Sequence, residues 1–343
     1  MMINCFNAQT TLRKITIFPL LGLGLICSSA PGVAQTPASY RRAADYSEAH
    51  GGYSVVVARQ NQIVFEAYAP GQSADRAHNL ASGTKSFSCA IAVAANQDGL
   101  LNWDERVAQT VNEWSRHPQK SKITIRQVLN LTSGIPGGPI RPLTYAQAIA
   151  VLPTYPPGTQ FQYGQIPFQV FAEVMRRKLL SRQEDPLQYL TRRVFQPIGL
   201  KVSYWQRGRD GQPHLPSGAR LTARQWLKYG LLVQNQGRWQ SKTILPWTTL
   251  QQCFQASAIH PGYGLSFWLN SVVGQPFTPP PGNPPFKGFP NAPGDTVMAL
   301  GFGGQGLYII SSLQMVVVRQ GVLSNRTNFD HDRFLGLLLN RSA

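Results

Sequence analysis

Residues 82–97 read SGTKSFSCAIAVAANQ, and the rest of the chain is best interpreted outward from this stretch. Small and apolar residues recur at helical spacing and Gly99 follows, which predicts a helix that begins at or near Ser82. Lys85 comes three residues after Ser82, and positions i and i+3 share one face of a helix. No other charged residue occurs until Asp98. The sequence therefore predicts that the Lys85 amine lies beside the Ser82 hydroxyl.

This pair of residue types indicates nucleophilic chemistry. A serine hydroxyl attacks a carbonyl once a neighbour removes its proton, and a lysine can do so when burial or nearby positive charge lowers its pKa. The N–H groups of a first helical turn would stabilise the negative charge that develops. A lysine among apolar neighbours such as Phe87, Ile91 and Val93 is costly to bury without a function. The simpler alternative is a solvent-exposed helix face that carries an unrelated serine and lysine.

The segments on either side predict a sheet made from both ends of the chain. Residues 52–59 (GYSVVVAR) and 63–68 (IVFEAY) are two β-rich runs separated by residues 60–62, a pattern that predicts a β-hairpin. The middle of the chain contains short helical patterns at residues 124–131, 145–151, 168–180, 186–194 and 222–234, the last with Thr222 as N-cap. Strand patterns return at residues 264–270, 296–300, 307–311 and 315–320, and a closing helix is expected at residues 330–340.

This order predicts an α+β fold in which an antiparallel sheet is flanked by terminal helices and carries an inserted, mostly helical lobe. We expect a discontinuous α/β sheet domain at residues 40–98 and 256–343, with the inserted lobe at residues 99–255. A crevice between the two would be the natural site. Residues 275–295 contain eight prolines, which prevent a regular ladder or helix, and are either a surface loop or a rim over the crevice.

The N-terminus predicts export. Arg13 and Lys14 precede an apolar run at residues 15–27, which is short for a membrane span and suits a signal peptide that ends at residue 34. We expect a secreted or periplasmic protein with no stable membrane span after cleavage. Cys89 and Cys253 would then remain; they could pair in an oxidising compartment, but two buried free thiols are the simpler interpretation.

The net charge of +17 is scattered along the chain. Its densest clusters, residues 176–178 and 192–193, lie in helical patterns without a nucleic-acid motif, which favours a solvated basic surface over a nucleic-acid partner. A basic exported protein could also favour anionic cell-wall polymers. His214 and His260 lack a neighbour at metal-ligand spacing and are expected to be structural, so no metal is predicted.

The Ser-x-x-Lys box, placed after a hairpin and before a helical insertion, resembles the serine β-lactamase and penicillin-binding-protein-like superfamily. That superfamily includes class C β-lactamases, D-alanyl-D-alanine carboxypeptidases, esterases and 6-aminohexanoate-oligomer hydrolases. Further segments resemble its boxes in the same order. These are residues 124–134 (TIRQVLNLTSG), 157–161 (PGTQF), 163–165 (YGQ), 195–200 (FQPIGL), 218–231 and 301–306 (GFGGQG).

The resemblance implies a role for each matching residue. Ser82 would be the nucleophile, Lys85 its base, and Tyr163 the phenol that moves protons to the leaving group. Gln165, Gly304 and Gln305 would bind substrate, and the N–H groups of Ser82 and Gln305 would form the oxyanion hole. No metal or organic cofactor is implied.

Two departures from the family pattern bear on the substrate. Gln165 replaces the usual asparagine, which keeps the amide and adds a methylene. Residues 302–304 (FGG) stand where the third box usually carries Lys or His, the cation that helps to bind a substrate carboxylate. This argues against a strong preference for β-lactams or D-Ala-D-Ala, and the pattern looks most like the esterase and 6-aminohexanoate-oligomer hydrolase branch.

The resulting hypothesis is an exported serine hydrolase that cleaves a small-molecule ester, amide or peptide through an acyl-enzyme on Ser82. A cell-wall-derived substrate is one candidate. The alternatives are a weak β-lactamase or D,D-carboxypeptidase, and a binding protein that keeps the fold without turnover.

Overall fold

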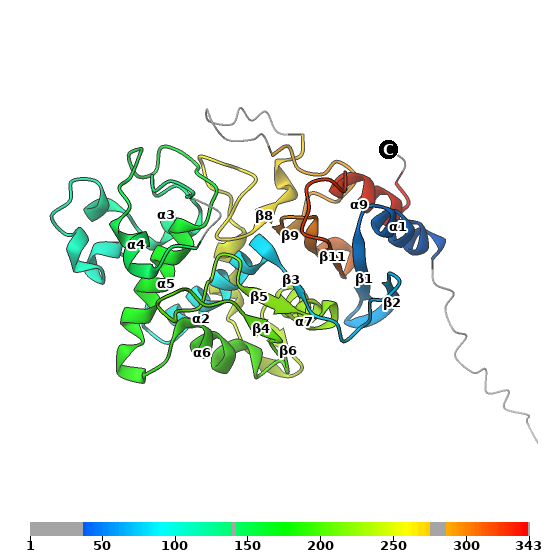
Figure 1. Ribbon diagram of the computed structural model, residues 1–343, viewed down its shortest axis with the longest axis horizontal. Coiled ribbons are helices and arrows are strands. Elements are labelled where there is room, and N and C mark those ends of the chain that lie inside the picture. The colour runs from blue at the N-terminus through cyan, green and yellow to red at the C-terminus, as the bar shows by residue number, and fades with distance from the viewer. Residues whose placement is uncertain (1–36, 139–141, 275–285, 342–343) are drawn as a thin grey trace, which may run out of the picture. The chain divides into compact units, whose positions relative to one another are not determined.

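The computed structural model describes residues 37–138, 142–274 and 286–341, and its elements are drawn in Figure 1. Residues 36–343 form one compact unit. The expected signal peptide at residues 1–34 lies outside the described residues, as do residues 275–285 of the proline-rich segment. The expected division of the unit into a sheet domain and an inserted lobe stays a prediction.

A six-stranded antiparallel sheet is built from both ends of this unit, as predicted. Its order is β2-β1-β11-β10-β9-β8, so the first strand lies between its hairpin partner and the last strand. The strands are β1 (Gly52–Arg59), β2 (Gln62–Tyr68), β8 (Trp268–Leu269), β9 (Thr296–Gly301), β10 (Gln305–Ile310) and β11 (Met315–Gly321).

Alternate side chains of the central strands enter two different hydrophobic cores. In β1, Val56 belongs to one core and Val55 and Val57 to the other. Successive side chains of a strand point to opposite faces, so an unbroken apolar run is expected where both faces are covered. Helices α1 (Ala38–Ala49) and α9 (His331–Leu339) pack side by side on one face, and α7 (Ala223–Gln234) packs on the other (Figure 1).

The middle of the chain is helical, as predicted. Thr124, Thr144 and Asp185 each begin a helix with a capping box, and the Thr222 side chain accepts from the Gln225 N–H as the predicted cap of α7. The helices are α2 (Phe87–Gln97), α3 (Ile125–Leu129), α4 (Tyr145–Ala150), α5 (Ile166–Lys178), α6 (Pro186–Leu190), which continues as a π turn at Thr191–Phe195, and α8 (Trp247–Leu250). The structure also contains two small sheets. One consists of β3 (His78–Asn79), β5 (Ala219–Leu221) and β4 (Tyr204–Trp205), and the other pairs β6 (Arg238–Trp239) with β7 (Lys242–Thr243).

The prediction of a strand over residues 264–270 is wrong for most of its length, because only Trp268–Leu269 joins the sheet. The Leu265 N–H donates to the Cys253 carbonyl, and the Ser266 N–H donates to the Leu129 carbonyl. Ser266 also has a positive φ of 70°. The backbone groups of this segment therefore bind loops and helix ends instead of a neighbouring strand.

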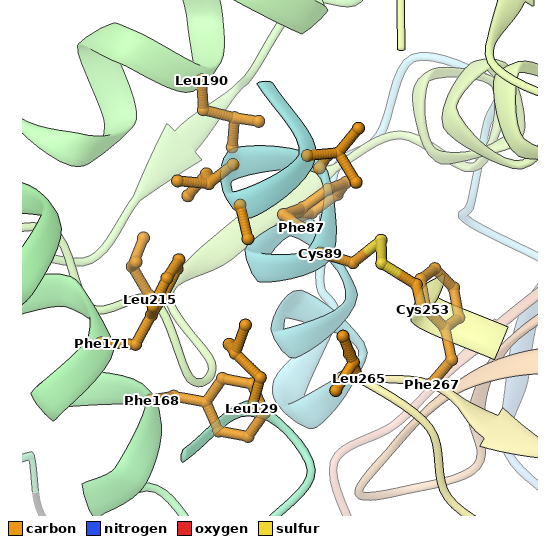
Figure 2. Packing of buried hydrophobic residues seen from close by; sticks show 14 of the residues in the cluster. Phe87, Cys89, Leu129, Phe168, Phe171, Leu190, Leu215, Cys253, Leu265 and Phe267 are labelled. Atoms are coloured by element: carbon orange, nitrogen blue, oxygen red, sulfur yellow. A yellow bond between two sulfur atoms is a disulfide. The ribbon is translucent and has the colours of Figure 1, made fainter. Parts of the chain in front are cut away.

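Cys89 and Cys253 form a disulfide, so the interpretation as free thiols is wrong. Cys89 lies on α2 and Cys253 lies on the 3₁₀ turn Gln251–Phe254, which directly follows α8. Figure 2 shows this disulfide in the core beside α2, with Phe87 near Cys89 and Phe267 near Cys253. The Cα atoms are 6.1 Å apart, within the range a disulfide requires. The sequence separation of 164 residues carries no information about this proximity.

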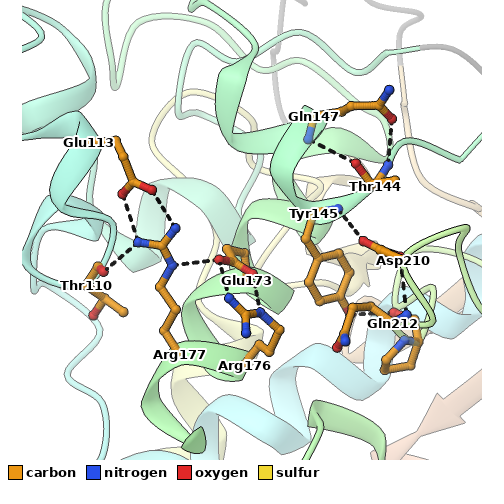
Figure 3. A network of polar contacts seen from close by, with 11 residues as sticks. Thr110, Glu113, Thr144, Tyr145, Gln147, Glu173, Arg176, Arg177, Asp210 and Gln212 are labelled. Atoms are coloured by element: carbon orange, nitrogen blue, oxygen red, sulfur yellow. Dashed lines mark hydrogen bonds and ion pairs between the residues drawn. The ribbon is translucent and has the colours of Figure 1, made fainter.

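The basic cluster at residues 176–178 is ion-paired, which qualifies the prediction of a merely solvated surface. Arg176 and Arg177 both bind the buried carboxylate of Glu173, and Arg177 also binds Glu113 (Figure 3). Lys178 pairs with Glu105. These contacts hold α5 against the turns that precede it in the chain.

Candidate active site

Ser82 and Lys85 are brought together by a 3₁₀ turn. Residues Ala81–Ser86 form this turn, which leads directly into α2. The helix predicted to begin near Ser82 therefore begins as a 3₁₀ helix and continues as an α-helix. Side chains at i and i+3 eclipse one another in a 3₁₀ helix. The Lys85 Nζ accordingly lies 2.9 Å from the Ser82 Oγ. The hydrogen bond between Lys85 and Ser82 that the sequence predicted is present.

The turn is held from two sides. The Leu80 N–H donates to the Ala219 carbonyl, and the Ala219 N–H donates to the Thr84 hydroxyl, which joins the turn to β5. On the other side, Gly301 ends β9 so close to the turn that a Cβ atom there would lie 2.2 Å from the Leu80 carbonyl oxygen. Ala81, next to Ser82, has a positive φ of 47°, a costly conformation for a residue with a side chain.

Lys85 is almost completely buried, with 1% of its surface exposed. Its second hydrogen bond goes to the Pro216 carbonyl at 3.2 Å, and its Nζ lies 5.2 Å from the centre of the Tyr163 ring. Among the described residues no carboxylate pairs with it. Burial lowers the pKa of Lys85 from 10.5 to about 7. A substantial fraction of the amine is therefore neutral near pH 7 and can accept the Ser82 proton.

Tyr163 completes the constellation. Burial raises the pKa of its phenol, while hydrogen bonds with Ser82 and Trp268 act in the opposite direction. The phenol therefore stays protonated at neutral pH and can donate. The backbone of Tyr163 packs directly against the backbone of Gly137. A Cβ atom at position 137 would lie only 2.2 Å from the Tyr163 carbonyl oxygen. Two facing glycines, Gly137 and Gly164, permit this approach.

None of the other residues proposed from the sequence, Gln165, Gly304 and Gln305, is among the described residues that line the cavity beside Ser82. Gln165 is the N-cap residue of α5, and its N–H donates to the Gly137 carbonyl at 2.7 Å. The Gln305 side chain is buried and bridges β10 to β11: it donates to the Gly321 carbonyl and accepts from the Gly321 N–H. The Gln305 backbone pairs with Gly301 at the end of β9, beside the nucleophile turn. Gly304 forms the β9–β10 turn with a φ of +74°.

A cavity of about 450 Å³ opens on Ser82 and Tyr163. Its wall is mostly aromatic, and the ring centres of Trp268 and Phe286 are 4.6 Å apart. The sequence analysis left residues 275–295 as either a surface loop or a rim over the crevice, and Phe286 and Phe289 of this segment lie in the wall. Besides Ser82 and Tyr163, the described lining residues are Trp268, Phe286, Phe289, Leu300, Gly301, Phe302 and His331.

His214 and His260 are both buried, as expected of structural residues. Burial lowers the pKa of each to about 4, and for His214 the charge of Lys85 adds to this effect. Over the described ranges no group of three or more His, Cys, Asp or Glu side chains is arranged to hold a metal ion. None of the helices in the described part of the chain is long and apolar enough to cross a bilayer.

Comparison with known proteins identifies the family and the fold. A sequence model described as Beta-lactamase matches residues 39–342. Comparison with curated protein sequences returned no match. Among solved structures, the chain is similar to a protein from Bacteroides dorei assigned as a β-lactamase, with a TM-score of 0.70, 17% identity, and coverage of 89% of this chain and 97% of that one.

Two further structures are similar over comparable lengths. One is a family VIII carboxylesterase, with a TM-score of 0.69, 16% identity, and coverage of 90% of this chain and 98% of that one. The other is a Bacillus anthracis protein assigned as a 6-aminohexanoate-dimer hydrolase, with a TM-score of 0.67, 20% identity, and coverage of 87% of this chain and 79% of that one. At these identities the likeness establishes the fold.

Proposed function

Since the chain belongs to the β-lactamase family, we propose that it is a serine hydrolase that transfers the acyl group of an ester or amide to water through Ser82. The observation that carries the proposal is the 2.9 Å contact between the Ser82 hydroxyl and a buried lysine amine. The carboxylesterase and 6-aminohexanoate-dimer hydrolase among the similar structures support the choice of ester or amide bonds.

The first half of the reaction forms the acyl-enzyme. Neutral Lys85 takes the proton of Ser82 as the Oγ atom bonds to the substrate carbonyl carbon. The oxygen of the tetrahedral intermediate is stabilised by the backbone N–H group of Ser82. The resemblance implied Gln305 as a second donor, but Gln305 is fully buried on β10 and does not line the cavity. The bond to the leaving group then breaks, and Tyr163 delivers a proton that originates on Lys85 to the departing oxygen or nitrogen.

The second half uses the same groups with water. A water molecule loses a proton to Lys85 as its oxygen attacks the acyl carbon. The Ser82 Oγ leaves and regains a proton, and a carboxylic acid is released. The side chains of this trio supply all the proton transfers.

The third-box region supports ester or amide substrates over β-lactams. Phe302 occupies the position at which related enzymes carry a cation, and its side chain is 55% exposed at the cavity wall. Gly303 and Gly304 carry no side chain that could replace that cation. A substrate carboxylate would find no ion-pair partner there.

We further propose that the protein is exported after removal of residues 1–34. The charged n-region and apolar core of this segment support export. The Cys89–Cys253 disulfide also supports it, because such bonds persist mainly in oxidising compartments.

The test is hydrolysis of a p-nitrophenyl ester by the parent, by Ser82→Ala and by a matched control, Ser88→Ala. Ser88 is a buried serine on α2 whose hydroxyl has no hydrogen-bond partner. We expect kcat/KM to fall at least about 10³-fold in Ser82→Ala and to change less than about twofold in Ser88→Ala. Unchanged hydrolysis in Ser82→Ala would refute the proposal.

Two added assays separate the alternatives. A chromogenic cephalosporin turned over faster than the ester would indicate a β-lactamase. Stoichiometric acylation of Ser82 without product release would indicate a binding protein.

A further inference from the structure

The cavity beside Ser82 has a wall made mostly of aromatic side chains. Phe286 lies between Trp268 and Phe289, with ring centres 4.6 Å and 5.6 Å away. Leu300 and Phe302 add apolar surface from the end of β9 and its turn. Aromatic side chains bind ring-shaped groups well in offset and edge-to-face geometry. At about 450 Å³, the cavity is large enough for a substituted benzene ring.

None of the described residues that line the cavity is a lysine or an arginine. Arg319, on the central strand β11, is fully buried. Its guanidinium donates to the Ser47 hydroxyl and to the carbonyls of Gly303 and His50. Its guanidinium carbon also lies 3.8 Å from the centre of the Phe329 ring. The guanidinium of Arg319 therefore makes structural contacts and does not serve as a partner for a substrate in the cavity. A charged substrate group in this cavity would lose hydration without gaining a partner.

One polar ring projects from α9 into this apolar wall. His331, the first residue of α9, stacks on Phe289 with ring centres 5.4 Å apart. Its Nδ1 is 2.5 Å from the Tyr308 hydroxyl, and its Nε2 makes no hydrogen bond with any described residue. Burial lowers the pKa of His331 to about 3, with the charge of Arg319 as a smaller cause, so the ring is neutral at physiological pH.

We propose that the cavity binds an uncharged aryl group of the substrate and that His331 determines specificity by hydrogen-bonding a neutral polar substituent on that ring. This inference rests on the proposed hydrolysis at Ser82 and adds the substrate class. The aromatic wall binds the ring, and the absence of a cation in the described wall selects against carboxylates. His331 supplies one directed polar contact through Nε2, its nitrogen that Tyr308 leaves unused.

The test compares matched substrates that differ only in charge. Aryl acetates and methyl arylacetates place the ring on either side of the scissile carbonyl, each with hydrogen, carboxamide or carboxylate at the para position. The carboxamide and carboxylate groups have nearly the same shape. After division by the hydroxide-catalysed rate, we expect kcat/KM in at least one series to be about tenfold or more higher for the carboxamide. An equal or higher value for the carboxylate in both series would overturn the proposal.

Variants assign the effect to residues. His331→Phe keeps an aromatic ring at this position, and we expect it to lower the ratio of kcat/KM for the carboxamide to kcat/KM for the unsubstituted substrate about 3–10-fold. Phe302→Ala, on an exposed turn, should reduce the preference for aryl over methyl esters. Lys287→Gln is the control, because Lys287 is exposed on the proline-rich segment and does not line the cavity. A carboxamide ratio that follows Lys287 instead of His331 would contradict the role of His331.

A binding measurement separates this inference from the proposed function. Calorimetry on Ser82→Ala with benzamide and benzoate requires no turnover. Tighter binding of benzamide would support the cavity assignment even if ester hydrolysis failed. Tighter binding of benzoate would overturn the assignment even if ester hydrolysis at Ser82 were established.

Discussion

Replacing Lys85 by methionine should abolish ester hydrolysis and, at the same time, raise the free energy of unfolding. Burial lowers the pKa of Lys85 from 10.5 to about 7. Each pKa unit corresponds to about 1.36 kcal/mol, so the protonated amine costs the folded state about 5 kcal/mol. Methionine fills a similar volume without the charge. It leaves the Pro216 carbonyl without its partner, which costs about 1–3 kcal/mol. The expected net gain is about 2–4 kcal/mol at pH 6.

The sign of the pH dependence follows from linkage. Below about pH 7 the amine is protonated in both the folded and unfolded states, so its full cost is present in the parent protein. Between about pH 7 and pH 10.5 the folded state releases its proton first, and the cost declines. The advantage of Lys85→Met over the parent should therefore shrink by about 2–3 kcal/mol between pH 6 and pH 9.

The assay is urea unfolding of both proteins at pH 6 and pH 9, with p-nitrophenyl ester turnover measured beside it. Lys242→Met serves as control, since Lys242 is exposed on β7, and its difference from the parent should stay within about 0.5 kcal/mol. A Lys85→Met variant that is less stable than the parent at pH 6 would refute the reasoning. So would a stability difference that does not change with pH.

Three further predictions concern the reaction and the scaffold. The kcat/KM for an uncharged ester should rise with pH and level off above about pH 7, because only neutral Lys85 accepts a proton; a rate independent of pH between about 5.5 and 8.5 would contradict this role. Gly301→Ala should lower kcat/KM at least about tenfold while the protein remains folded by circular dichroism, because the added Cβ would push β9 from the Leu80 carbonyl and displace the nucleophile turn; full activity in this variant would show that the approach is unimportant. Replacing Cys89 and Cys253 together by alanine should lower the free energy of unfolding by about 2–4 kcal/mol in urea, and dithiothreitol should then have no effect on the variant's stability; parent-like stability would count against the disulfide.

The features that could be predicted from the sequence are those with a local pattern. The β1–β2 hairpin, the strands of the sheet other than most of residues 264–270, and α7 with its Thr222 cap all have periodicity or end signals within a few residues. The proximity of Ser82 and Lys85 follows from their spacing alone. The resemblance to a family added Tyr163, which lies far along the chain but within hydrogen-bond contact of Ser82.

The features that were missed depend on tertiary contacts. Trp268 lies on the short strand β8 and His331 is the first residue of α9, and the fold places both in the cavity wall. The sequence around each residue contains no local pattern that predicts this position. The Cys89–Cys253 bond joins residues whose separation of 164 positions says nothing about distance. Residues 264–270 have the apolar composition of a strand, but their backbone hydrogen bonds go to Leu129 and Cys253.

The most direct test of the central claim is the site of covalent labelling by a fluorophosphonate. The reagent forms a bond between phosphorus and an activated serine oxygen, and fluoride leaves. Peptide mass spectrometry of the labelled protein should locate a single adduct on Ser82, and labelling should slow strongly in Lys85→Met because the 2.9 Å base contact is lost. An adduct on another residue, or labelling of Ser82 at an unchanged rate in Lys85→Met, would contradict the account.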